Sequence, residues 1–584
     1  MKRILLAAVN AKYIHSNLAV YSLRAYARKQ GILTDLAEYT INQPQDEIMK
    51  DIFRYRPDVL CFSCYIWNIS FVRELIYDLS KVLPETEIWV GGPEVSYDAG
   101  KVLEENPAIH GVMRGEGEKT FAELADWILR KEGSSEEYRR NGIREIRGIT
   151  YRDEQGLIQK NLDREIMELS EVPFPYEDLS AFDYRIIYYE SSRGCPFSCS
   201  YCLSSVDKCL RFRDTELVKQ ELQFFIDRKV AQVKFVDRTF NCRKEHAMEI
   251  WRFILESDNG FTNFHFEVAA DLTTEEELEL FRKMRPGLIQ LEIGVQSTNP
   301  KTVEEIHRKM DFHKVAEIVR KVQTGHNIHQ HLDLIAGLPF EDYESFSESF
   351  RDVYRLHPDQ LQMGFLKVLK GSYMAEHLQE YEGVCRNKEP YEILSTRWLS
   401  YADVIRLKQV EEMVEVYYNS GQFQNLLQEV ETKYRNMFHF FEGLGIFYEE
   451  RGYGKISHTR IRRYEILLEF LKEAFPDKIQ KFCNLAVLDV YARENAKSRP
   501  HFAADNGPYK DCLREFFQRE EVTRELLPSY EGYGWKQMWK MTHVEIISSI
   551  GEQPKAILFD YNERDPLTGS ARQIDVTERI IRGC

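Results

Sequence analysis

Hydrophobic runs alternate with amphipathic helical patterns along the first part of the chain. Within residues 1–131 the apolar runs are RILLAAV, DLAEYTI, VLCFSCYI, EIWVGG and IHGVMRG. Helical patterns separate them, such as SNLAVYSLRAYARKQG, in which Gly31 is placed to end a helix. Strands and helices in this order predict a parallel, doubly wound, Rossmann-like sheet, which binds ligands outside the carboxyl ends of its strands.

The same rhythm resumes between residues 185 and 375. The strand candidates there are IIYYESS, QVKFVDRTF, FHFEVAA, LIQLEIGVQS, HQHLDLIAGLP and QLQMGFLKVL, each followed by a helical pattern. Repeated strand and helix units predict a partial (βα)6 barrel with its active groups at the carboxyl ends of the strands. Residues 132–184 read as a linker, because GSSEEYRRNG is polar and loop-like and EVPFPYEDLS is rich in proline; GITYRDEQGLIQKN can add an edge hairpin.

Residues 376–584 predict a mainly helical third domain. In YADVIRLKQVEEMVEVYYNSGQF an apolar face repeats at helical spacing, whereas the tail AILFDYNERDPLTGSARQIDV favours extended chain with a turn over residues 565–569. The aromatic residues of this region are expected in its core: Tyr417, Phe438, Phe440, Phe441, Trp535 and Trp539. The predicted fold class is therefore α/β for the first two domains, with a helical domain at the end.

Composition narrows the choice of compartment and partner. The chain has 584 residues, 43% of them hydrophobic, and a net charge of −16 without a polybasic run. This argues against a nucleic-acid partner. The start MKRILLAAVNAKY is too short in apolar residues for a signal peptide, and no apolar run reaches the ~18 residues of a membrane span. We expect a cytoplasmic enzyme without a membrane partner.

The most specific chemical signal is the spacing CxxxCxxC at Cys195, Cys199 and Cys202, in the loop after the first barrel strand. Three thiolates on one loop can hold three irons of a four-iron four-sulfur cluster and leave the fourth iron open. The alternatives are a structural zinc loop or three core thiols. Zinc needs a fourth ligand, and the nearest further cysteine, Cys209, follows a polar stretch.

This motif resembles that of the radical S-adenosylmethionine (SAM) enzymes, in which SAM chelates the open iron and is cleaved to a 5'-deoxyadenosyl radical. The resemblance implies a 4Fe-4S cluster and SAM as cofactors, with Tyr201 beside the adenine. It also places SAM contacts at later strand ends, where the alternative for each residue is a strand-end cap or a salt bridge. The residues are Asp237 in FVDRTFN, Glu267 and Glu292 ending strands three and four, Gln296 and Ser297 in GVQS, and Gly337 and Glu341 in IAGLPFE. Asp237 and Arg238 stand where the family carries paired glycines.

The N-terminal loops add a second resemblance. NxxYxHSNLA after the first strand and VGGPE after the fourth are similar to the cobalamin-binding domain of one radical SAM subclass; the other reading is a structural flavodoxin-like domain. The expected cobalamin contacts are Asn10, Tyr13, His15, Ser16, Asn17, Gly91, Gly92, Pro93, Glu94, Gly115 and Glu116. The C-terminal region is similar to an uncharacterised extension of some members.

No histidine is expected to bind cobalt. The cobalt-ligating motif DxHxxG has one partial match, Asp311 and His313, but Ala316 stands where glycine is needed, so we interpret it as a helix face. His15 is expected to form a hydrogen bond or lie in a helix's first turn. Cys61 and Cys64 should be core thiols on opposite faces of a strand.

The combination predicts a methyltransferase that uses the radical and cobalamin to methylate an unactivated carbon or phosphorus centre of a small molecule or peptide. A flavodoxin or ferredoxin would supply the electron. The alternatives are a non-methylating radical rearrangement, cyclisation or redox reaction, and a noncatalytic corrinoid or iron-sulfur sensor.

Overall fold

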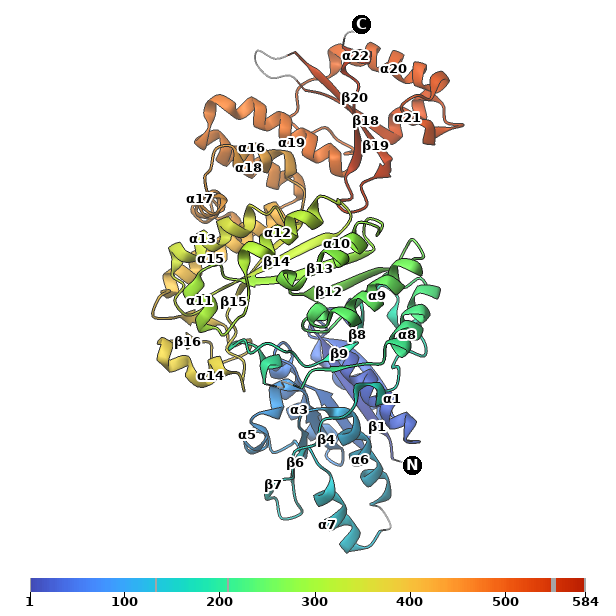
Figure 1. Cartoon of the computed structure of the whole chain (residues 1–584), viewed down its shortest axis with the longest axis vertical. Helices are drawn as coiled ribbons and strands as arrows, with labels where there is room; N and C mark the ends of the chain where they lie inside the picture. Colours follow the sequence, from blue (N-terminus) through green and yellow to red (C-terminus); the bar gives the residue numbers. More distant parts are fainter. Residues whose placement is uncertain (1, 132–133, 207–208, 548–552, 582–584) are drawn as a thin grey trace.

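The computed structural model describes residues 2–131, 134–206, 209–547 and 553–581. The chain forms an elongated molecule in which three regions follow one another, with the N- and C-termini near opposite ends (Figure 1). No helix among these residues has the length and apolar character needed to cross a bilayer.

The N-terminal region is a doubly wound sheet, as predicted. Its strands have the order β2-β1-β3-β4-β5-β6-β7, in which β1 to β5 are parallel and β6 and β7 are antiparallel. The elements are β1 (Ile4–Asn10), α1 (Leu18–Lys29), β2 (Asp35–Thr40), α2 (Gln45–Tyr55), β3 (Val59–Ser63), α3 (Ile69–Val82), β4 (Glu87–Gly91), α4 (Pro93–Ser96), α5 (Ala99–Glu105), β5 (Gly111–Met113), α6 (Gly117–Arg130), α7 (Glu136–Glu145), β6 (Ile149–Arg152) and β7 (Ile158–Lys160).

The linker is more ordered than its composition suggested. The expected hairpin exists as β6 and β7 and extends the N-terminal sheet. The prediction of a loop at GSSEEYRRNG is wrong, because helix α7 begins within this segment, at Glu136. Gly133, the first residue of the segment, lies outside the described residues. Serines followed by glutamates are a typical helix start, a signal that the polar composition hid.

The second region is the predicted partial barrel, a parallel sheet of order β15-β14-β13-β12-β11-β8. Its strands are β8 (Ile187–Tyr189), β11 (Gln232–Phe235), β12 (Asn263–Val268), β13 (Ile289–Gln296), β14 (His329–Ala336) and β15 (Gln360–Phe365). A short antiparallel pair, β9 (Ser192–Arg193) and β10 (Arg211–Phe212), brackets the cysteine loop. The helices are α8 (Thr215–Asp227), α9 (Lys244–Glu256), α10 (Glu275–Phe281), α11 (Pro300–Glu305), α12 (Phe312–Gln323) and α13 (Tyr343–Tyr354).

The third region is mainly helical, as expected, but it ends in a sheet. Val404, Leu407, Val410 and Val414 are buried on the predicted helix face, and the expected turn closes through a hydrogen bond from Gly569 N to Asp565 O (2.8 Å). The main elements are α14 (Tyr373–His377), β16 (Val384–Cys385), β17 (Ile393–Ser395), α15 (Tyr401–Met413), α16 (Gln424–Glu431), α17 (Met437–Glu450), α18 (Arg460–Ala474), α19 (Ile479–Arg493), α20 (Lys510–Thr523), α21 (Trp535–Met541), β18 (Thr542–Ile547), β19 (Lys555–Arg564), β20 (Ala571–Asp575) and α22 (Thr577–Ile580).

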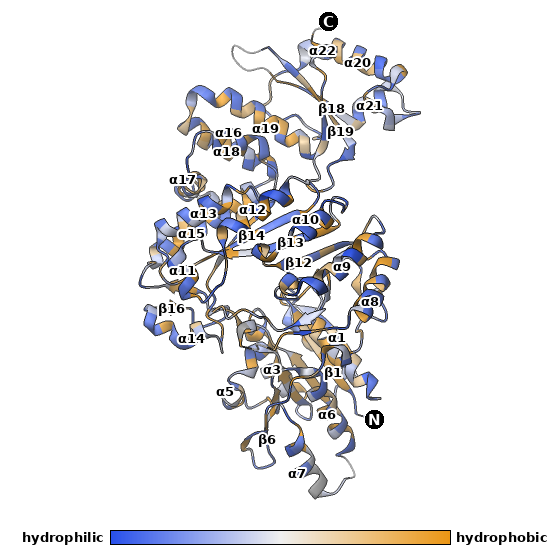
Figure 2. Cartoon of the chain, viewed as in Figure 1, coloured by the Kyte–Doolittle hydropathy of each residue, from blue (hydrophilic) through white to orange (hydrophobic). Residues whose placement is uncertain are grey.

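The barrel sheet has one apolar face and one polar face. Val233, Phe235, Phe264 and Phe266 are buried toward the helices, where Trp251 of α9 packs against Phe266. The alternate positions, which face away from the helices, are largely polar, and Figure 2 shows many hydrophilic residues along β12 to β14. Closed barrels fill this space with branched apolar residues. Here the inner face is left for polar groups.

A buried polar knot fixes the chain that follows the carboxyl ends of β13 and β14. Glu341 accepts hydrogen bonds at Oε1 from Ser297 (2.6 Å) and Ser349 (2.9 Å), while its Oε2 is buried with no partner among the described residues. Burial raises the pKa of Glu341 to about 7, although both serines favour the carboxylate. The knot ties β13 to α13 through side chains that water barely reaches.

Replacing Glu341 should change how stability depends on pH. In the unfolded chain this carboxyl ionises near its ordinary pKa of about 4.3, so the folded protein loses stability as pH rises from there to about 7. Glu341→Gln removes that contribution. Its loss of unfolding free energy between pH 5 and pH 7.5 should be about 1 to 3 kcal/mol smaller than that of the wild type.

Denaturant unfolding at both pH values measures the difference. Glu344→Gln, which changes an exposed carboxyl three residues later in the first turn of α13, should keep the wild-type dependence. If Glu341→Gln also keeps it, Glu341 ionises in the folded protein like an ordinary surface group.

Candidate functional site

A cavity of about 1020 Å³ lies where the N-terminal sheet meets the barrel. The loops after β1, β3, β4 and β5 form one wall, and the ends of β8, β9 and β11 form the other. The structure therefore brings together loops that the sequence placed at the carboxyl ends of both sets of strands. The expected cobalamin contacts that line this cavity are Asn10, His15, Ser16, Asn17, Gly91, Gly92, Pro93, Gly115 and Glu116.

Two expected cobalamin contacts lie outside the cavity lining. Tyr13 is 60% exposed, and the Arg185 guanidinium lies over its ring at 4.7 Å. Glu94 is buried, accepts a hydrogen bond from the Tyr391 hydroxyl and forms an ion pair with Lys370 (3.2 Å). Both side chains therefore serve contacts within the protein, which a motif match alone could not distinguish from ligand contacts.

Glu94 belongs to a tether between the N-terminal domain and the chain that leaves the barrel. Lys370 also pairs with Asp98 (3.2 Å), and Glu389 pairs with Arg73 (3.5 Å). The residues around β16 and β17 thus hold the edge of the N-terminal domain beside β4.

The loop after β1 is fixed by Glu38, which the sequence analysis missed. Glu38 Oε1 accepts from Asn10 Nδ2 and from the backbone N–H of Asn17, both at 2.9 Å. Its Oε2 accepts from Tyr21 (2.6 Å) and Arg185 (2.7 Å). A carboxylate shared in this way holds the loop in one conformation and joins it to the barrel entrance.

His15 forms a hydrogen bond, one of the two roles expected for it. Its Nδ1 lies 2.7 Å from the hydroxyl of Tyr188, a β8 residue that lines the cavity. Burial and the charges of Lys12 and Lys234 lower the pKa of His15. Nearby, Ser16 Oγ donates to Ile186 O (3.0 Å), so the loop docks on the first barrel strand.

Glycine stands at two positions of this wall for different physical reasons. Gly92 has φ +113°, and a Cβ there would meet Cys64 O at 2.4 Å, so its close approach is to the protein's own backbone. A Cβ on Gly115 would meet nothing within 4 Å, so this glycine leaves open space at the cavity wall. Cys61 and Cys64 are buried on opposite faces of the sheet, as predicted, and burial raises the pKa of each to about 12.

Aromatic and cationic side chains at the cavity were not predicted. Tyr65 and Trp67 stack with ring centroids 4.3 Å apart, and Trp67 is 45% exposed. Arg238 reaches the cavity from the end of β11. The sequence analysis named no residue of the loop over residues 65–70, because two aromatic residues in a loop do not by themselves indicate that their rings stack at a cavity.

The cysteine loop lies beside this cavity, between β9 and β10. Cys195 and Cys199 are buried and Cys202 is half-buried. Backbone hydrogen bonds fix the middle of the loop, from Ser200 N to Ile306 O (2.9 Å) and from Met374 N to Ser200 O (2.8 Å). Among the described residues, no group of three or more His, Cys, Asp or Glu side chains could hold a single metal ion.

Arg308 is a site residue that the sequence analysis missed. Its Nη1 lies 3.8 Å from Cys199 Sγ and donates to Tyr201 OH (3.3 Å), while Nη2 donates to Gly294 O. Burial raises the pKa of the Cys199 thiol, and the Arg308 guanidinium opposes that rise. Only folding brings Arg308, after α11, to the cysteine loop, so no local motif could have shown it.

Asp237 braces the strand that leads to the cysteine loop. Its oxygens accept from Ser191 N (3.0 Å), Ser191 Oγ (2.6 Å) and Ser192 Oγ (2.6 Å), and the side chain is fully buried. Burial raises the pKa of Asp237 to about 6 against these three donors. The geometry favours a positioning role over the direct SAM contact that we expected.

The two glutamates expected at strand ends differ. Glu267 is near the end of β12, its side chain forms no hydrogen bond or ion pair among the described residues, and burial raises its pKa to about 7. Glu292 is not at a strand end, which corrects the sequence reading: it lies within β13 and accepts from Lys234 and His265, both at 2.9 Å. Burial opposes the charged form of Glu292, but these two donors hold its pKa well below the usual range.

The remaining expected SAM contacts divide between two places. Gln296 is in the left-handed region (φ +73°), at an irregularity in β13 where Gly294 leaves room for its amide. Such strain is typical of functional sites. Ser297 and Glu341 pair with each other in the buried knot, and a Cβ on Gly337 would meet Ile393 Cγ2 at 2.5 Å. Gly337 therefore allows close packing rather than ligand access.

The inner face of the barrel carries a polar network that was not predicted as a unit. Lys234, His265 and Gln290 lie in register on neighbouring strands, and Glu292 lies beside His331. His331 also pairs with Asp333 (2.9 Å). Because these side chains are mostly half-buried, they can donate and accept hydrogen bonds with a ligand that lies against the inner face of the sheet.

The donor set of the cysteine loop suits an iron-sulfur cluster. Thiolates are the protein ligands of such clusters, and Cys195, Cys199 and Cys202 would supply three of them. Cys195 Sγ lies 3.7 Å from Thr239 Oγ1, and Arg308 Nε is buried without a partner among the described residues. The loop thus combines buried sulfur atoms with a nearby cation.

Family models match the chain in three segments. Residues 4–125 match the B12 binding domain, residues 189–353 match the radical SAM superfamily, and residues 379–559 match a protein family of unknown function, DUF4080. These segments correspond to the doubly wound sheet, the barrel and the greater part of the C-terminal region.

Individual proteins are similar to large parts of the chain. An uncharacterised methyltransferase of Pyrococcus horikoshii is 24% identical over 66% of this chain and 80% of its own length. The cobalamin-dependent radical SAM methyltransferase TokK of Streptomyces tokunonensis is 25% identical over 50% of this chain, which spans 44% of TokK.

A solved structure shares the fold. The radical SAM methyltransferase TsrM of Kitasatospora setae, with cobalamin and a [4Fe-4S] cluster bound, superposes with a TM-score of 0.54 at 17% identity, over 67% of this chain and 80% of TsrM. The B12-binding and radical SAM segments meet at one cavity beside the cysteine loop. The chain therefore carries a domain of the B12-binding family and a domain of the radical SAM superfamily, the two cofactor-binding domains expected from the sequence.

Proposed function

We propose that the protein reductively cleaves SAM and methylates an unactivated carbon or phosphorus centre of a polar substrate. The observation that carries this proposal is the shared cavity. Its walls include the corrin-facing loops of the N-terminal domain and also Arg193 and Gly194, which directly precede Cys195. A cobalamin there and a SAM at the cluster would face the same space.

The bound cofactors would supply a 5'-deoxyadenosyl radical, which activates the substrate, and a methyl group for transfer. The chain's own residues hold and orient the partners. Arg308 and Tyr201 fix the cysteine loop beside β13, while Glu267 and Gln296 offer polar contacts to SAM at the strand ends.

The inner face of the barrel indicates where the substrate binds and of what kind it is. Lys234, His265, Glu292 and His331 would form hydrogen bonds with a substrate that carries polar groups. An extended hydrocarbon would offer nothing to the hydrogen-bonding capacity that these groups keep beyond their protein partners, at a cost of about 1 to 3 kcal/mol for each donor or acceptor left buried and unmatched. A polar small molecule or a peptide side chain suits this face best.

Cluster chemistry sets the expected partner and compartment. An external one-electron donor such as a flavodoxin or ferredoxin would reduce the cluster. The cluster is sensitive to oxygen, and the cysteine loop needs reduced thiols. Both requirements support a reducing compartment, the cytoplasm. The net charge of −16 argues against a nucleic-acid partner, because such partners are themselves negatively charged.

The direct test uses anaerobic, reconstituted protein with a reductant, SAM bearing a CD3 group, and metabolites from cells that lack the protein. Formation of both 5'-deoxyadenosine and S-adenosylhomocysteine, with CD3 in a product detected by mass spectrometry, is the expected result. SAM cleavage without CD3 transfer would indicate a rearrangement, cyclisation or redox reaction instead. If SAM is not cleaved with any of these metabolites, the result would favour a noncatalytic sensor.

The ligand set is tested by replacing cysteines one at a time. Cys195→Ala should abolish the cluster absorption and the formation of 5'-deoxyadenosine, because the loop would lose one of three iron ligands. Cys209→Ala, at an exposed cysteine, and Cys242→Ala, at a half-buried one, are the controls and should keep both signals. Iron content and the absorption spectrum report the outcome; cluster loss in either control would show a wrong assignment.

Filling the cavity should block cobalamin without affecting the cluster. Ala19 lies in α1 and lines the cavity, so the indole of Ala19→Trp would occupy ligand space. The dissociation constant for hydroxocobalamin should rise about tenfold or more, equal to about 1.4 kcal/mol or more. Gln30→Trp, at the exposed end of the same helix, is the control in an absorbance titration. Unchanged affinity in Ala19→Trp would place cobalamin elsewhere.

A further inference from the structure

The base of the cysteine loop brings two arginines together. β9 and β10 pair antiparallel, with Arg193 directly opposite Arg211. Like charges at opposed positions of a strand pair repel each other and destabilise the pairing. The loop that carries Cys195, Cys199 and Cys202 is therefore closed by a strand pair that needs anions nearby.

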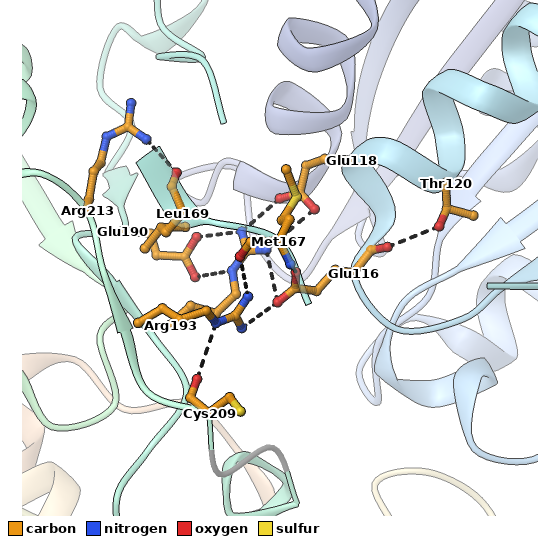
Figure 3. Close-up of polar contacts among 10 residues, drawn as sticks. Glu116, Glu118, Thr120, Met167, Leu169, Glu190, Arg193, Cys209 and Arg213 are labelled. Carbon is orange, nitrogen blue, oxygen red and sulfur yellow. Dashed lines mark hydrogen bonds and ion pairs between the residues drawn. The ribbon is translucent and has the colours of Figure 1, made fainter. Parts of the chain in front are cut away.

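Most of those anions come from the N-terminal domain. Arg193 Nη2 lies 2.7 Å from Glu118 Oε1, and its Nη1 lies 3.6 Å from Glu116 Oε1. Glu116 Oε1 also accepts from Arg211 Nη2 (2.5 Å). The third anion, Glu190, is local to the barrel and binds Arg193 at 2.9 and 2.7 Å. Figure 3 shows Glu116, Glu118 and Glu190 around the guanidinium of Arg193.

The same contacts fasten the linker. Arg211 Nη1 donates to Met167 O (2.9 Å), and the backbone N–H of Met167 donates to Glu116 Oε2 (3.4 Å). Arg213, two residues after Arg211, donates to Leu169 O (2.9 Å). The linker therefore crosses the base of the cysteine loop and is held by both domains (Figure 3).

These charged groups also face the ligand space. Glu116, Glu118, Arg193 and Gly194 all line the cavity, and the exposed fractions of the Arg193 and Glu118 side chains are only 20% and 6%. Ion pairs with so little water are screened less than surface pairs and are harder to open. A molecule that fills the cavity touches the Arg114–Glu118 turn and the start of the cysteine loop together.

We propose that Glu116 and Glu118 of the N-terminal domain and Arg193 and Arg211 of the barrel form an interdomain clamp, through which cobalamin binding holds the cysteine loop closed. These residues are positioning residues. The inference rests on the binding of both cofactors and goes beyond the proposed reaction. By linkage, the cluster must strengthen cobalamin binding by the same factor as cobalamin stabilises the cluster.

The clamp is tested by removing iron from the full-length protein. The anaerobic protein, with its cluster oxidised and no reductant present, is mixed with the chelator bathophenanthroline disulfonate, with and without saturating hydroxocobalamin. Cobalamin should slow iron loss by about fivefold or more, within the usual range of coupling between sites. No slowing in the wild type would overturn the proposal.

Glu118→Gln should bring the slowing below about twofold, because it removes the closest interdomain partner of Arg193 while Glu190 remains. Glu94→Gln is the matched control, since it weakens the other tether, to Tyr391 and Lys370, and leaves the clamp intact. Each variant is compared at its own saturating cobalamin concentration, with circular dichroism and initial iron content confirming that it is folded and loaded.

The outcomes separate the clamp from simpler explanations. If Glu118→Gln keeps the full slowing, cobalamin merely blocks the chelator and the clamp is rejected. If Glu94→Gln loses the slowing equally, any contact between the domains suffices and the assignment to these residues is wrong. Cluster-free Cys195→Ala should bind hydroxocobalamin more weakly than the cluster-loaded wild type; equal affinity would also contradict the proposal. Methyl transfer is not measured, so failure of the proposed reaction would leave these readings unaffected.

Discussion

The arrangement depends on buried charges that face each other across the junction of two α/β domains. The carboxyl ends of parallel strands are where such domains bind ligands, and here two sets of strand ends oppose one another around one cavity. Arg193 and Arg211 on the barrel side meet Glu116 and Glu118 on the other. If either domain lacked these charges, the buried charges of the other would lose their interdomain partners, which is costly.

This constraint explains why motif residues serve the protein as well as a ligand. Glu116 lines the cavity and also forms an ion pair with Arg211. Glu94 of the VGGPE motif instead binds Tyr391 and Lys370. His15 likewise reaches Tyr188 of the barrel. The loops that shape the cavity are thus the loops that dock the domains, so ligand binding and domain position are linked by the same side chains.

Sequence patterns predicted the strands well because both sheets alternate or run apolar over several residues, as in β1 and β13. The cluster motif and most of the cavity loops followed from local spacing. Arg308, Glu38 and the clamp could not be predicted, because their partners lie far away in the chain. Glu292 was misplaced for a similar reason: polar residues line the inner face of the barrel along each strand, so polarity did not mark a strand end.

The central claim is that the cobalamin and the cluster occupy adjoining sites at one domain junction. Electron paramagnetic resonance of the full-length protein, carrying cob(II)alamin and a reduced cluster, tests it directly, because two paramagnetic centres that face one cavity interact magnetically. The account predicts splitting or broadening of both signals, which disappears in cluster-free Cys195→Ala. A spectrum equal to the sum of the two separate centres would contradict it.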